Sequence, residues 1–362
     1  MSETTARQAR IPDGVVNLAD YERVAERVLD ANAWAYFAGG AGDEITLRWN
    51  RETFDRTALS SRVLRVTKVD TRVELLGRAF AHPILVAPVA YQQLAHPDGE
   101  RAAAIAAAAQ ETGLVLSTLS SLSLEDVAAV AGPRRWFQLY LQRERAHTLD
   151  LVHRAEAAGY EAVVVTVDAP INGLRTREQR VRFQLPPGMT PANLSRYPSP
   201  APPADVRPIE FFMANAPTWP DIAWLSDQTR LPILLKGILA AGDADRAFEH
   251  GAQGVIVSNH GGRTFDTAPA TFDVLGEIVE KVGGRGPVLI DGGIRRGTDV
   301  LKCIARGAAA VLVGRPIAYG LAAAGALGVA HVLRLLRDEF EIAMALTGCG
   351  SLSDVEPGLL RR

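Results

Sequence analysis

Cysteine, excess charge and long apolar runs are all scarce in this sequence. Only two cysteines occur, Cys303 and Cys349, which excludes a disulfide scaffold and fits a reducing compartment. The formal net charge is −2, so nothing indicates a nucleic-acid partner. No run approaches the ~20 apolar residues that cross a bilayer, and residues 1–10 lack the apolar core of a secretory signal. We therefore expect a cytoplasmic protein without a membrane partner.

The chain does contain a regular alternation of strand-like and helix-like segments. Its 362 residues are 48% hydrophobic, enough to bury a sizeable core. Short apolar runs alternate with Ala-rich or amphipathic segments, and no G-x-G-x-x-G nucleotide turn accompanies them. This pattern predicts one α/β domain over residues 1–362, built as a (β/α)8 TIM barrel. The predicted strands are Ile84–Ala87, Leu114–Thr118, Trp136–Tyr140, Ala162–Thr166, Pro232–Lys236, Gly254–Ser258, Val288–Asp291 and Ala310–Gly314.

Several segments lie outside this repeat. Residues 17–35 have helical spacing, with Asn17 or Asp20 as possible caps, and predict an N-terminal helical segment. We expect residues 1–12 to form a disordered tail. Residues 185–217 are rich in proline and follow the fourth strand, which predicts a lid-like loop or a disordered insertion. Residues 317–346 predict a long helix that closes the barrel from outside.

Polar residues gather just past the predicted strand ends, where barrels of this kind build their active sites. After the seventh strand comes Asp291-Gly292-Gly293-Ile294-Arg295, and after the eighth comes Gly314-Arg315. Glycines expose backbone N–H groups and the arginines add positive charge. Each turn alone could be an ordinary tight turn. Together they predict a site for a phosphorylated cofactor or substrate.

The sixth strand runs into Ser258-Asn259-His260-Gly261-Gly262-Arg263, a polar loop with a candidate general base and an anion-binding arginine. For a lone His the alternative interpretation is a solvated turn. Arg175 and Arg263 together suggest a bidentate site for a substrate carboxylate.

Four further side chains complete the predicted site. Tyr36 and Tyr140 would supply hydroxyl donors, and Asp168 would orient the imidazole of His260. The alternative for Asp168 is a turn cap before Pro170. Lys236 ends a buried strand and needs an anionic partner, because an unpaired buried ammonium is costly.

Six motifs, in this order, resemble the FMN-dependent 2-hydroxy-acid oxidase and dehydrogenase family: F-Q-L-Y, T-V-D-x-P, L-x-K-G, S-N-H-G-G-R-x-x-D, D-G-G-I-R-R-G-x-D and G-R-P. The resemblance covers residues 18–354 and is greatest to the mandelate and hydroxymandelate oxidase branch. It implies a barrel that binds FMN and oxidises an (S)-2-hydroxy acid to the 2-oxo acid. A phosphate-binding barrel enzyme without flavin is the alternative from a different class.

The resemblance also implies a role for each predicted site residue. His260 would be the base, with Asp168 behind it; Arg175, Arg263 and Tyr36 would hold the substrate carboxylate, and Tyr140 the hydroxyl. Lys236 would lie by the pyrimidine end of the flavin. The implied cofactor-binding set is Ala87, Pro88, Val89, Ala90, Ser120, Gln138, Thr166, Lys236, Ser258, Gly261, Asp291, Gly292, Gly293, Arg295, Gly314 and Arg315. No metal ligands are expected, and family members suggest a homotetramer.

Individual residues also lead to expectations about the substrate and the electron acceptor. Leu122, smaller than the tryptophan of glycolate oxidases, would leave room for an aromatic ring, with Tyr91 stacking on it and Asn172 reaching it or facing solvent. Lactate, glycolate or a long-chain 2-hydroxy acid are the alternative substrates. Ala90 matches oxidases, so we expect oxygen as acceptor and hydrogen peroxide as product, with a quinone-dependent dehydrogenase as the alternative. After Arg175 the family usually continues Arg-Glu-Ala-Asp, whereas Thr176-Arg177-Glu178 follows here.

Overall fold

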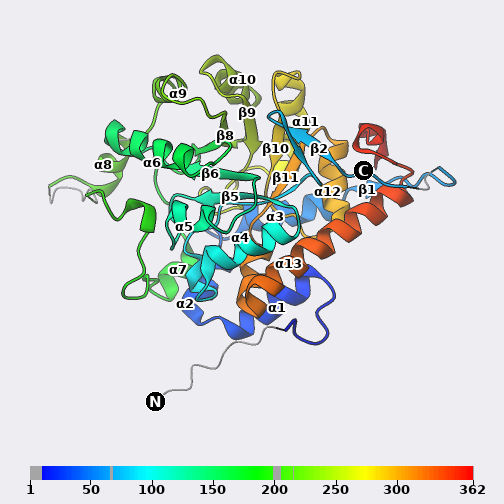
Figure 1. The fold of residues 1–362 in the computed structure, drawn as a ribbon, viewed down its shortest axis with the longest axis horizontal. Coiled ribbons are helices and arrows are strands. Elements are labelled where there is room, and N and C mark those ends of the chain that lie inside the picture. The colour runs from blue at the N-terminus through cyan, green and yellow to red at the C-terminus, as the bar shows by residue number, and fades with distance from the viewer. Residues whose placement is uncertain (1–9, 66–67, 199–204, 215, 362) are drawn as a thin grey trace.

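A closed barrel of parallel strands forms the centre of the molecule. The computed structural model describes residues 10–361, apart from 66–67, 199–204 and 215. The strand order around the barrel is β10-β11-β4-β5-β6-β7-β8-β9, with all pairs parallel. All eight predicted strands are present, which confirms the TIM barrel (Figure 1). They are β4 (Ile84–Val86), β5 (Gly113–Ser117), β6 (Arg135–Leu139), β7 (Val163–Thr166), β8 (Ile233–Ile238), β9 (Gly254–Val257), β10 (Val288–Ile290) and β11 (Ala310–Val313).

Helices cover the outside of the barrel, and buried side chains that point inward from the strands fill its inside. The surrounding helices are α4 (Gly99–Ala109), α5 (Leu124–Ala128), α6 (Arg145–Ala157), α9 (Trp219–Ser226), α10 (Ala241–Glu249), α11 (Thr271–Val282) and α12 (Gly297–Ala305). Successive residues of a strand point to opposite faces. Each strand therefore contributes side chains both to the inside of the barrel and to the layer between the barrel and the helices. The inner layer includes Leu85, Trp136 and Leu289, all buried. A hairpin of β2 (Val73–Leu75) and β3 (Arg78–Phe80) adds buried Leu75 and Phe80 to it.

The predicted closing helix is α13 (Arg315–Leu346), which packs against α1, α4 and α12. It bends at Ala324 and Gly325, where the backbone leaves helical geometry. By length and hydropathy α13 could cross a membrane, which corrects the expectation that no run comes close. Most of its apolar window is nevertheless buried inside the protein, because it faces the helices of the barrel. Its apolar character is therefore that of a core helix.

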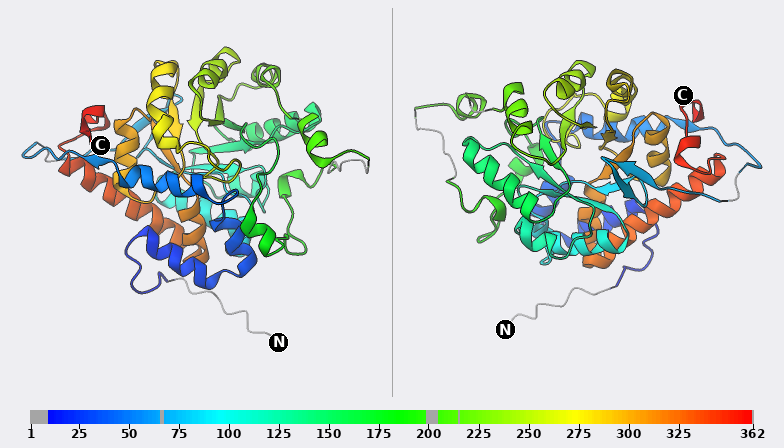
Figure 2. Two further views of the ribbon diagram at one scale, coloured as in Figure 1. Left: turned by 180° about the vertical axis from the view of Figure 1, so that it is seen from behind. Right: turned by 45° about the horizontal axis from the view of Figure 1, so that its top comes forward.

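The N-terminal helices cross the mouth of the barrel. Asn17 caps α1 (Leu18–Val28), and Asp20 completes the capping box, so both suggested residues take part. Next come α2 (Ala31–Ala38), capped by Asp30, and α3 (Ile45–Asp55). Figure 2 shows the blue helices α1 and α2 beside the start of α13. A two-residue strand, β1 (Ala58–Leu59), pairs with β12 (Leu360–Arg361) away from the barrel.

The proline-rich segment after β7 contains only short elements: α7 (Thr176–Arg180) precedes it, and η2 (Ala192–Leu194) and α8 (Pro208–Ala214) lie within it. Its first part is fastened to the barrel. Asn193 is fully buried, accepts from Leu124 N at 2.8 Å and donates to Thr118 O at 3.3 Å. The side chain of Asn32 exchanges two hydrogen bonds with the backbone of Gln184. A lid role stays a prediction, and residues 1–9 of the expected tail lie outside the described part of the chain.

We predict that Trp136→Ala lowers the free energy of unfolding by about 3–5 kcal/mol, because it empties the centre of the inner layer. Trp136 is 2% exposed and lies edge-on to Phe80 at 6.0 Å between ring centroids. Trp49 is 41% exposed and serves as the control; its replacement by alanine should change stability by less than about 1 kcal/mol. Urea denaturation measures both, and equal effects would contradict this account of the core.

Candidate active site

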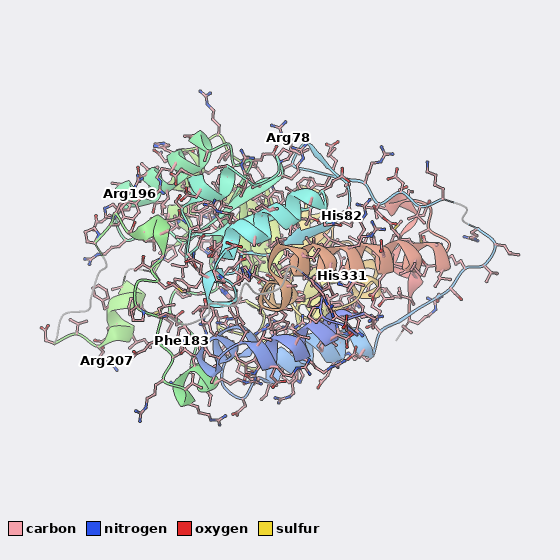
Figure 3. The ribbon with its side chains drawn as sticks, turned by 60° about the horizontal axis from the view of Figure 1, so that its bottom comes forward. Arg78, His82, Phe183, Arg196, Arg207 and His331 are labelled. Atoms are coloured by element: carbon pink, nitrogen blue, oxygen red, sulfur yellow. The ribbon has the colours of Figure 1, made fainter. Side chains whose placement is uncertain are left out.

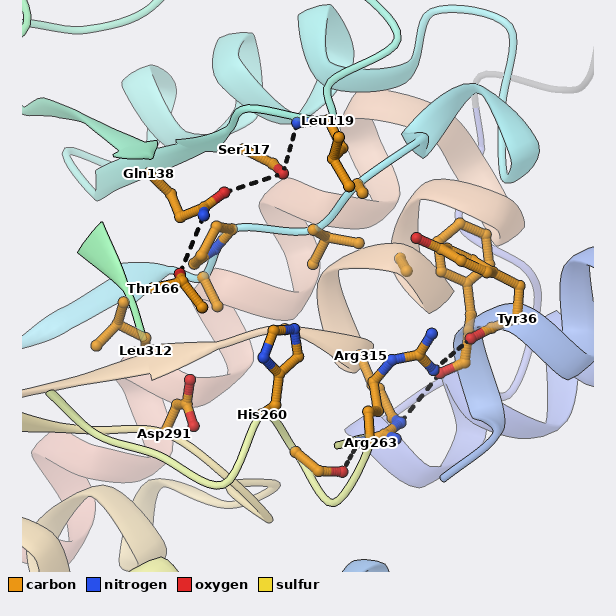
Figure 4. Close-up of a pocket in the computed structure, with 18 of the residues that line it drawn as sticks. Tyr36, Ser117, Leu119, Gln138, Thr166, His260, Arg263, Asp291, Leu312 and Arg315 are labelled. Carbon is orange, nitrogen blue, oxygen red and sulfur yellow. Dashed lines mark hydrogen bonds between the residues drawn. The ribbon is translucent and has the colours of Figure 1, made fainter. Parts of the chain in front are cut away.

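A cavity of about 400 Å³ opens at the carboxyl ends of the barrel strands. Most of the residues predicted for the site line it (Figure 4). These are Tyr36, Ala87, Pro88, Val89, Ala90, Gln138, Tyr140, Thr166, Arg175, Lys236, His260, Gly261, Arg263, Asp291, Gly292, Gly293, Arg295, Gly314 and Arg315. Their convergence follows from the parallel barrel, which brings all strand ends to one face.

His260 and Asp168 form a pair on one wall of this cavity. His260 Nδ1 lies 2.9 Å from Asp168 Oδ1, and Figure 4 shows the His260 ring pointing into the pocket. Burial alone would raise the pKa of Asp168, but the nearby His260 and Lys236 outweigh it and lower that pKa. Asp168 is therefore an ionised acceptor, Nδ1 carries the proton, and Nε2 stays free to accept one. Asp168 does not itself line the cavity; it orients His260 as predicted rather than only capping a turn.

The backbone of β8 makes room for this pair. At Gly237 φ is +115°, and a Cβ atom there would lie 2.5 Å from the Cβ of Asp168. Any other residue would push the carboxylate away from His260. The second oxygen of Asp168 is buried without a hydrogen-bond partner among the described residues. The absence of a Cβ atom at Gly237 thus keeps the carboxylate within hydrogen-bond distance of His260.

Arg175 and Arg263 lie together on the wall of the same cavity. Arg263 donates from Nη1 to Tyr36 O at 2.5 Å and to Gly39 O at 2.9 Å, and its guanidinium lies 5.0 Å from the centre of the Tyr36 ring. Arg175 Nε donates to Arg263 O at 3.3 Å. Burial and the charge of Arg175 lower the pKa of Arg263. Two adjacent cations facing a cavity are a binding site for an anionic group.

Two tyrosine hydroxyls complete this side of the cavity. Burial raises the pKa of Tyr36, and burial together with Asp168 raises the pKa of Tyr140. Both phenols therefore stay protonated at neutral pH and remain hydrogen-bond donors.

Lys236 finds its anionic partner in the protein itself. Its Nζ lies 2.9 Å from Asp291 Oδ2 and donates to Ser258 Oγ at 2.8 Å. Burial alone would lower the pKa of Lys236, but Asp291 and Asp168 raise it above its usual value. The lysine is thus a fixed buried cation on the wall of the cavity. Ser258 is fully buried and does not line the cavity, so it contributes by holding Lys236 and His260 N.

The two glycine-rich turns line the cavity, and the positive charges of their arginines, Arg295 and Arg315, are not neutralised by an ion pair among the described residues. Arg315 donates to the carbonyls of Phe37, Gly39 and Gly261. Burial lowers its pKa to about 10, and Arg263 and Arg295 act in the same direction. Within the described residues, neither Arg295 nor Arg315 lies at ion-pair distance from a carboxylate. This arrangement fits the predicted phosphate group, which would supply the missing negative charge.

Polar atoms on the rest of the wall fit a planar polar ring system and its hydroxylated chain. Gln138 Nε2 donates to Thr166 Oγ1 at 3.0 Å, while its Oε1 accepts from Ser117 Oγ at 3.2 Å. Asp291 Oδ1 is buried and has no hydrogen-bond partner among the residues described. It is free to accept from a ligand hydroxyl.

Ser120 is a predicted cofactor-binding residue that the structure places away from the cavity wall, as it does Ser258. It is fully buried and does not line the cavity, because β5 ends at Ser117 and the chain then turns. Ser117 takes that place, level with Gln138 in the register of β5 and β6. Ser117 is the last residue of β5, whereas the predicted strand ends one residue later, at Thr118. Leu122 likewise lies away from the cavity and packs against the outer core, whereas Leu119 lines the cavity.

Sequence reasoning also missed several residues on the cavity wall. They are Phe37, Glu178, Phe183, Leu185, Ile294, Leu312, Val313 and Ala318. Phe183 and Leu185 come from the start of the proline-rich segment, and Glu178 comes from α7. No single periodic pattern marks these positions, because they come from α2, α7, β11, α13 and the loops between elements.

Comparisons with known proteins agree with this geometry. Residues 25–362 match the family model described as FMN-dependent dehydrogenase. An L-lactate oxidase from Alicycliphilus denitrificans is 51% identical over 351 residues, covering 96% of each chain. A glycolate oxidase from Zea mays is 45% identical over 347 residues, covering 94% of each. A crystal structure of mandelate oxidase with (S)-2-phenylpropionate superposes with a TM-score of 0.87 at 47% identity, over 96% of this chain and 98% of that one.

The match spans the barrel, the cavity and both glycine-rich turns, and the unneutralised arginines fit a phosphorylated cofactor. The protein is thus an oxidoreductase with FMN as its cofactor, and this chain belongs to the FMN-dependent dehydrogenase family of 2-hydroxy-acid oxidases.

Proposed function

We propose that this chain oxidises (S)-2-hydroxy acids of the mandelate type to 2-oxo acids and passes the electrons to oxygen. The balanced reaction converts the hydroxy acid and O2 into the 2-oxo acid and H2O2. One observation carries the proposal. One cavity is lined both by an oriented base, His260, and by a pair of arginines, Arg175 and Arg263, that can bind a carboxylate.

FMN, when bound, supplies the two-electron acceptor for the substrate. Arg295 and Arg315 would hold its phosphate, and Ser117, Gln138, Thr166 and Lys236 offer polar groups to its ring. These side chains are already hydrogen-bonded to neighbours, so the site is largely preformed.

The chain's own residues orient the substrate and move a proton. Arg175 and Arg263 bind the carboxylate as two forks, with Tyr36 as an added donor. Tyr140 donates to the substrate hydroxyl oxygen, which becomes the carbonyl. His260 Nε2 accepts a proton from the substrate, and Asp168 stabilises the imidazolium that forms.

The wall around the substrate side chain supports an aryl substrate. Tyr91, Leu119, Phe183 and Leu185 all line the cavity. Phe183 stacks on Tyr36 with 5.0 Å between ring centroids, and Tyr91 lies edge-on to Tyr36 at 6.1 Å. Phe183 lies where the segment after α7 meets the N-terminal helices (Figure 3). Such aromatic surfaces stabilise a ring by about 0.5–1.5 kcal/mol per pair beyond area burial.

We propose that Leu119 leaves room for the aromatic ring of the substrate, which is the role predicted for Leu122. Asn172 lines the cavity and is at the same time exposed to solvent, so its position is compatible with both of its expected roles. The solved mandelate oxidase favours this substrate class, while the lactate and glycolate oxidases keep small 2-hydroxy acids as the second candidate.

Oxygen as the acceptor is supported by the similar curated proteins, which are named as oxidases. Ala90 lines the cavity, as the comparison with oxidases requires.

We predict that His260→Gln retains FMN but reduces it roughly 10²–10⁴-fold more slowly, because the proton acceptor is lost. Anaerobic mixing with mandelate, followed at the flavin absorption maximum, measures this rate. His153, an exposed residue of α6, provides the control variant His153→Gln. Near-normal reduction in His260→Gln would show that another residue is the base.

Arg175→Lys is expected to raise KM for mandelate by at least about tenfold, with a smaller effect on kcat, since an ammonium cannot replace the bidentate fork. Steady-state peroxide production measures both constants. A change confined to kcat would mean that Arg175 does not hold the carboxylate.

For the substrate, we predict a kcat/KM for (S)-mandelate roughly 10–200 times that for lactate or glycolate. Leu119→Trp should fill the space for the ring and reverse this order, while Leu122→Trp in the outer core should act only through stability. A panel in which lactate or a long-chain 2-hydroxy acid outperforms mandelate would overturn the aryl specificity.

A further inference from the structure

Glu178 joins the two arginines that face the substrate site, and the mechanism above gives it no role. Its Oε1 atom accepts from Arg175 Nη1 at 3.1 Å and from Arg263 Nη2 at 3.2 Å. All three side chains are about 15% exposed and all line the cavity. A carboxylate of the protein therefore shares the positive charge that the substrate carboxylate would use.

The position of Glu178 is fixed from both sides of α7. Its neighbour Arg177 points away from the cavity and pairs with Glu44 Oε2 at 2.6 Å. Glu44 Oε1 accepts in turn from Gly40 N at 3.0 Å, so α7 is anchored beyond the C-terminus of α2. Because α7 is held by this outer pair, Glu178 need not hold the helix in place.

The contacts of Glu178 are long for charge-assisted hydrogen bonds, which usually measure about 2.7–2.9 Å. One oxygen serves both guanidinium groups, and neither contact is as short as the Arg177–Glu44 pair. Each guanidinium carries five donors. An incoming carboxylate can thus bind the remaining donors while Glu178 stays nearby.

The charges define what such an arrangement does. Two arginines and one glutamate leave one net positive charge, which a single substrate carboxylate neutralises. We propose that Glu178 is a positioning residue that keeps the two guanidinium groups together in the free enzyme, and that its negative charge weakens binding of the carboxylate ligand. This inference rests on the proposed function, since it takes a 2-hydroxy acid and its 2-oxo acid product as the ligands.

As a consequence, the charge of Glu178 favours release of the product carboxylate from a site that also binds the substrate carboxylate. Without the carboxylate of Glu178, the product carboxylate would face two uncompensated cations at short range and leave more slowly. The carboxylate of Glu178 and the carboxylate of a bound ligand carry like charges, and these repel each other strongly a few ångströms apart in a partly buried site. The substitution Glu178→Gln keeps one acceptor oxygen and nearly the same shape; it removes the negative charge and replaces the second oxygen with an NH2 group.

The test is a binding titration of the FMN-loaded enzyme with phenylglyoxylate, and in parallel with pyruvate, followed by the change in the flavin spectrum. We expect Glu178→Gln to lower Kd roughly 3- to 30-fold at low ionic strength, with a smaller difference at high salt. Glu44→Gln is the matched control: it loses a carboxylate that pairs with an arginine of the same region but leaves Arg175 and Arg263 unchanged. Its Kd should stay within about twofold of wild type.

Each outcome bears on one claim. A Kd that is unchanged or larger in Glu178→Gln, with normal flavin content and melting temperature, overturns the inference, because a purely structural role predicts weaker binding. If Glu178→Gln does not fold, Glu178→Ala removes the same charge and is read in the same way. Wild-type enzyme that binds neither 2-oxo acid refutes the proposed function instead.

Discussion

Two buried guanidinium groups, those of Arg263 and Arg315, fix the end of helix α2 against the barrel. Together they bind the carbonyl oxygens of Tyr36, Phe37 and Gly39, which are among the last in α2 and have no partner within the helix. Cations at the C-terminus of a helix are favoured by its dipole. The same two arginines line the cavity, so one set of contacts both completes the fold and positions the site.

This arrangement explains why a residue from the N-terminal segment belongs to the site. Tyr36 precedes the first barrel strand by almost fifty residues, yet its ring lies over Arg263 and stacks on Phe183. His260 and Lys236 come from the barrel and its loops, whereas Tyr36 comes from α2 and Phe183 from the segment after α7. The cavity is thus built from parts of the chain that lie far apart in sequence.

The barrel could be predicted because its strands are buried on both faces and therefore appear as apolar runs that end in polar residues. The same logic located His260, Lys236 and the glycine-rich turns. It did not find Ser117 and Leu119, which line the cavity where Ser120 and Leu122 were expected, because the direction of a side chain near a strand end depends on the turn. Glu178 contacts Arg263 and Phe183 contacts Tyr36, and both partners lie far away in the sequence. The local sequence pattern therefore could not predict that these two residues line the cavity.

The pairing of β4 with β11 has a consequence for synthesis on the ribosome. Val86 pairs with Val313, so the barrel cannot close until the eighth strand has left the exit tunnel. Until then the nascent chain carries seven apolar strands with an open edge at β4 and another at the growing end. Such edges invite pairing with other chains. Production of this protein should therefore depend more on chaperone capacity and translation speed than the stability of its finished barrel would suggest.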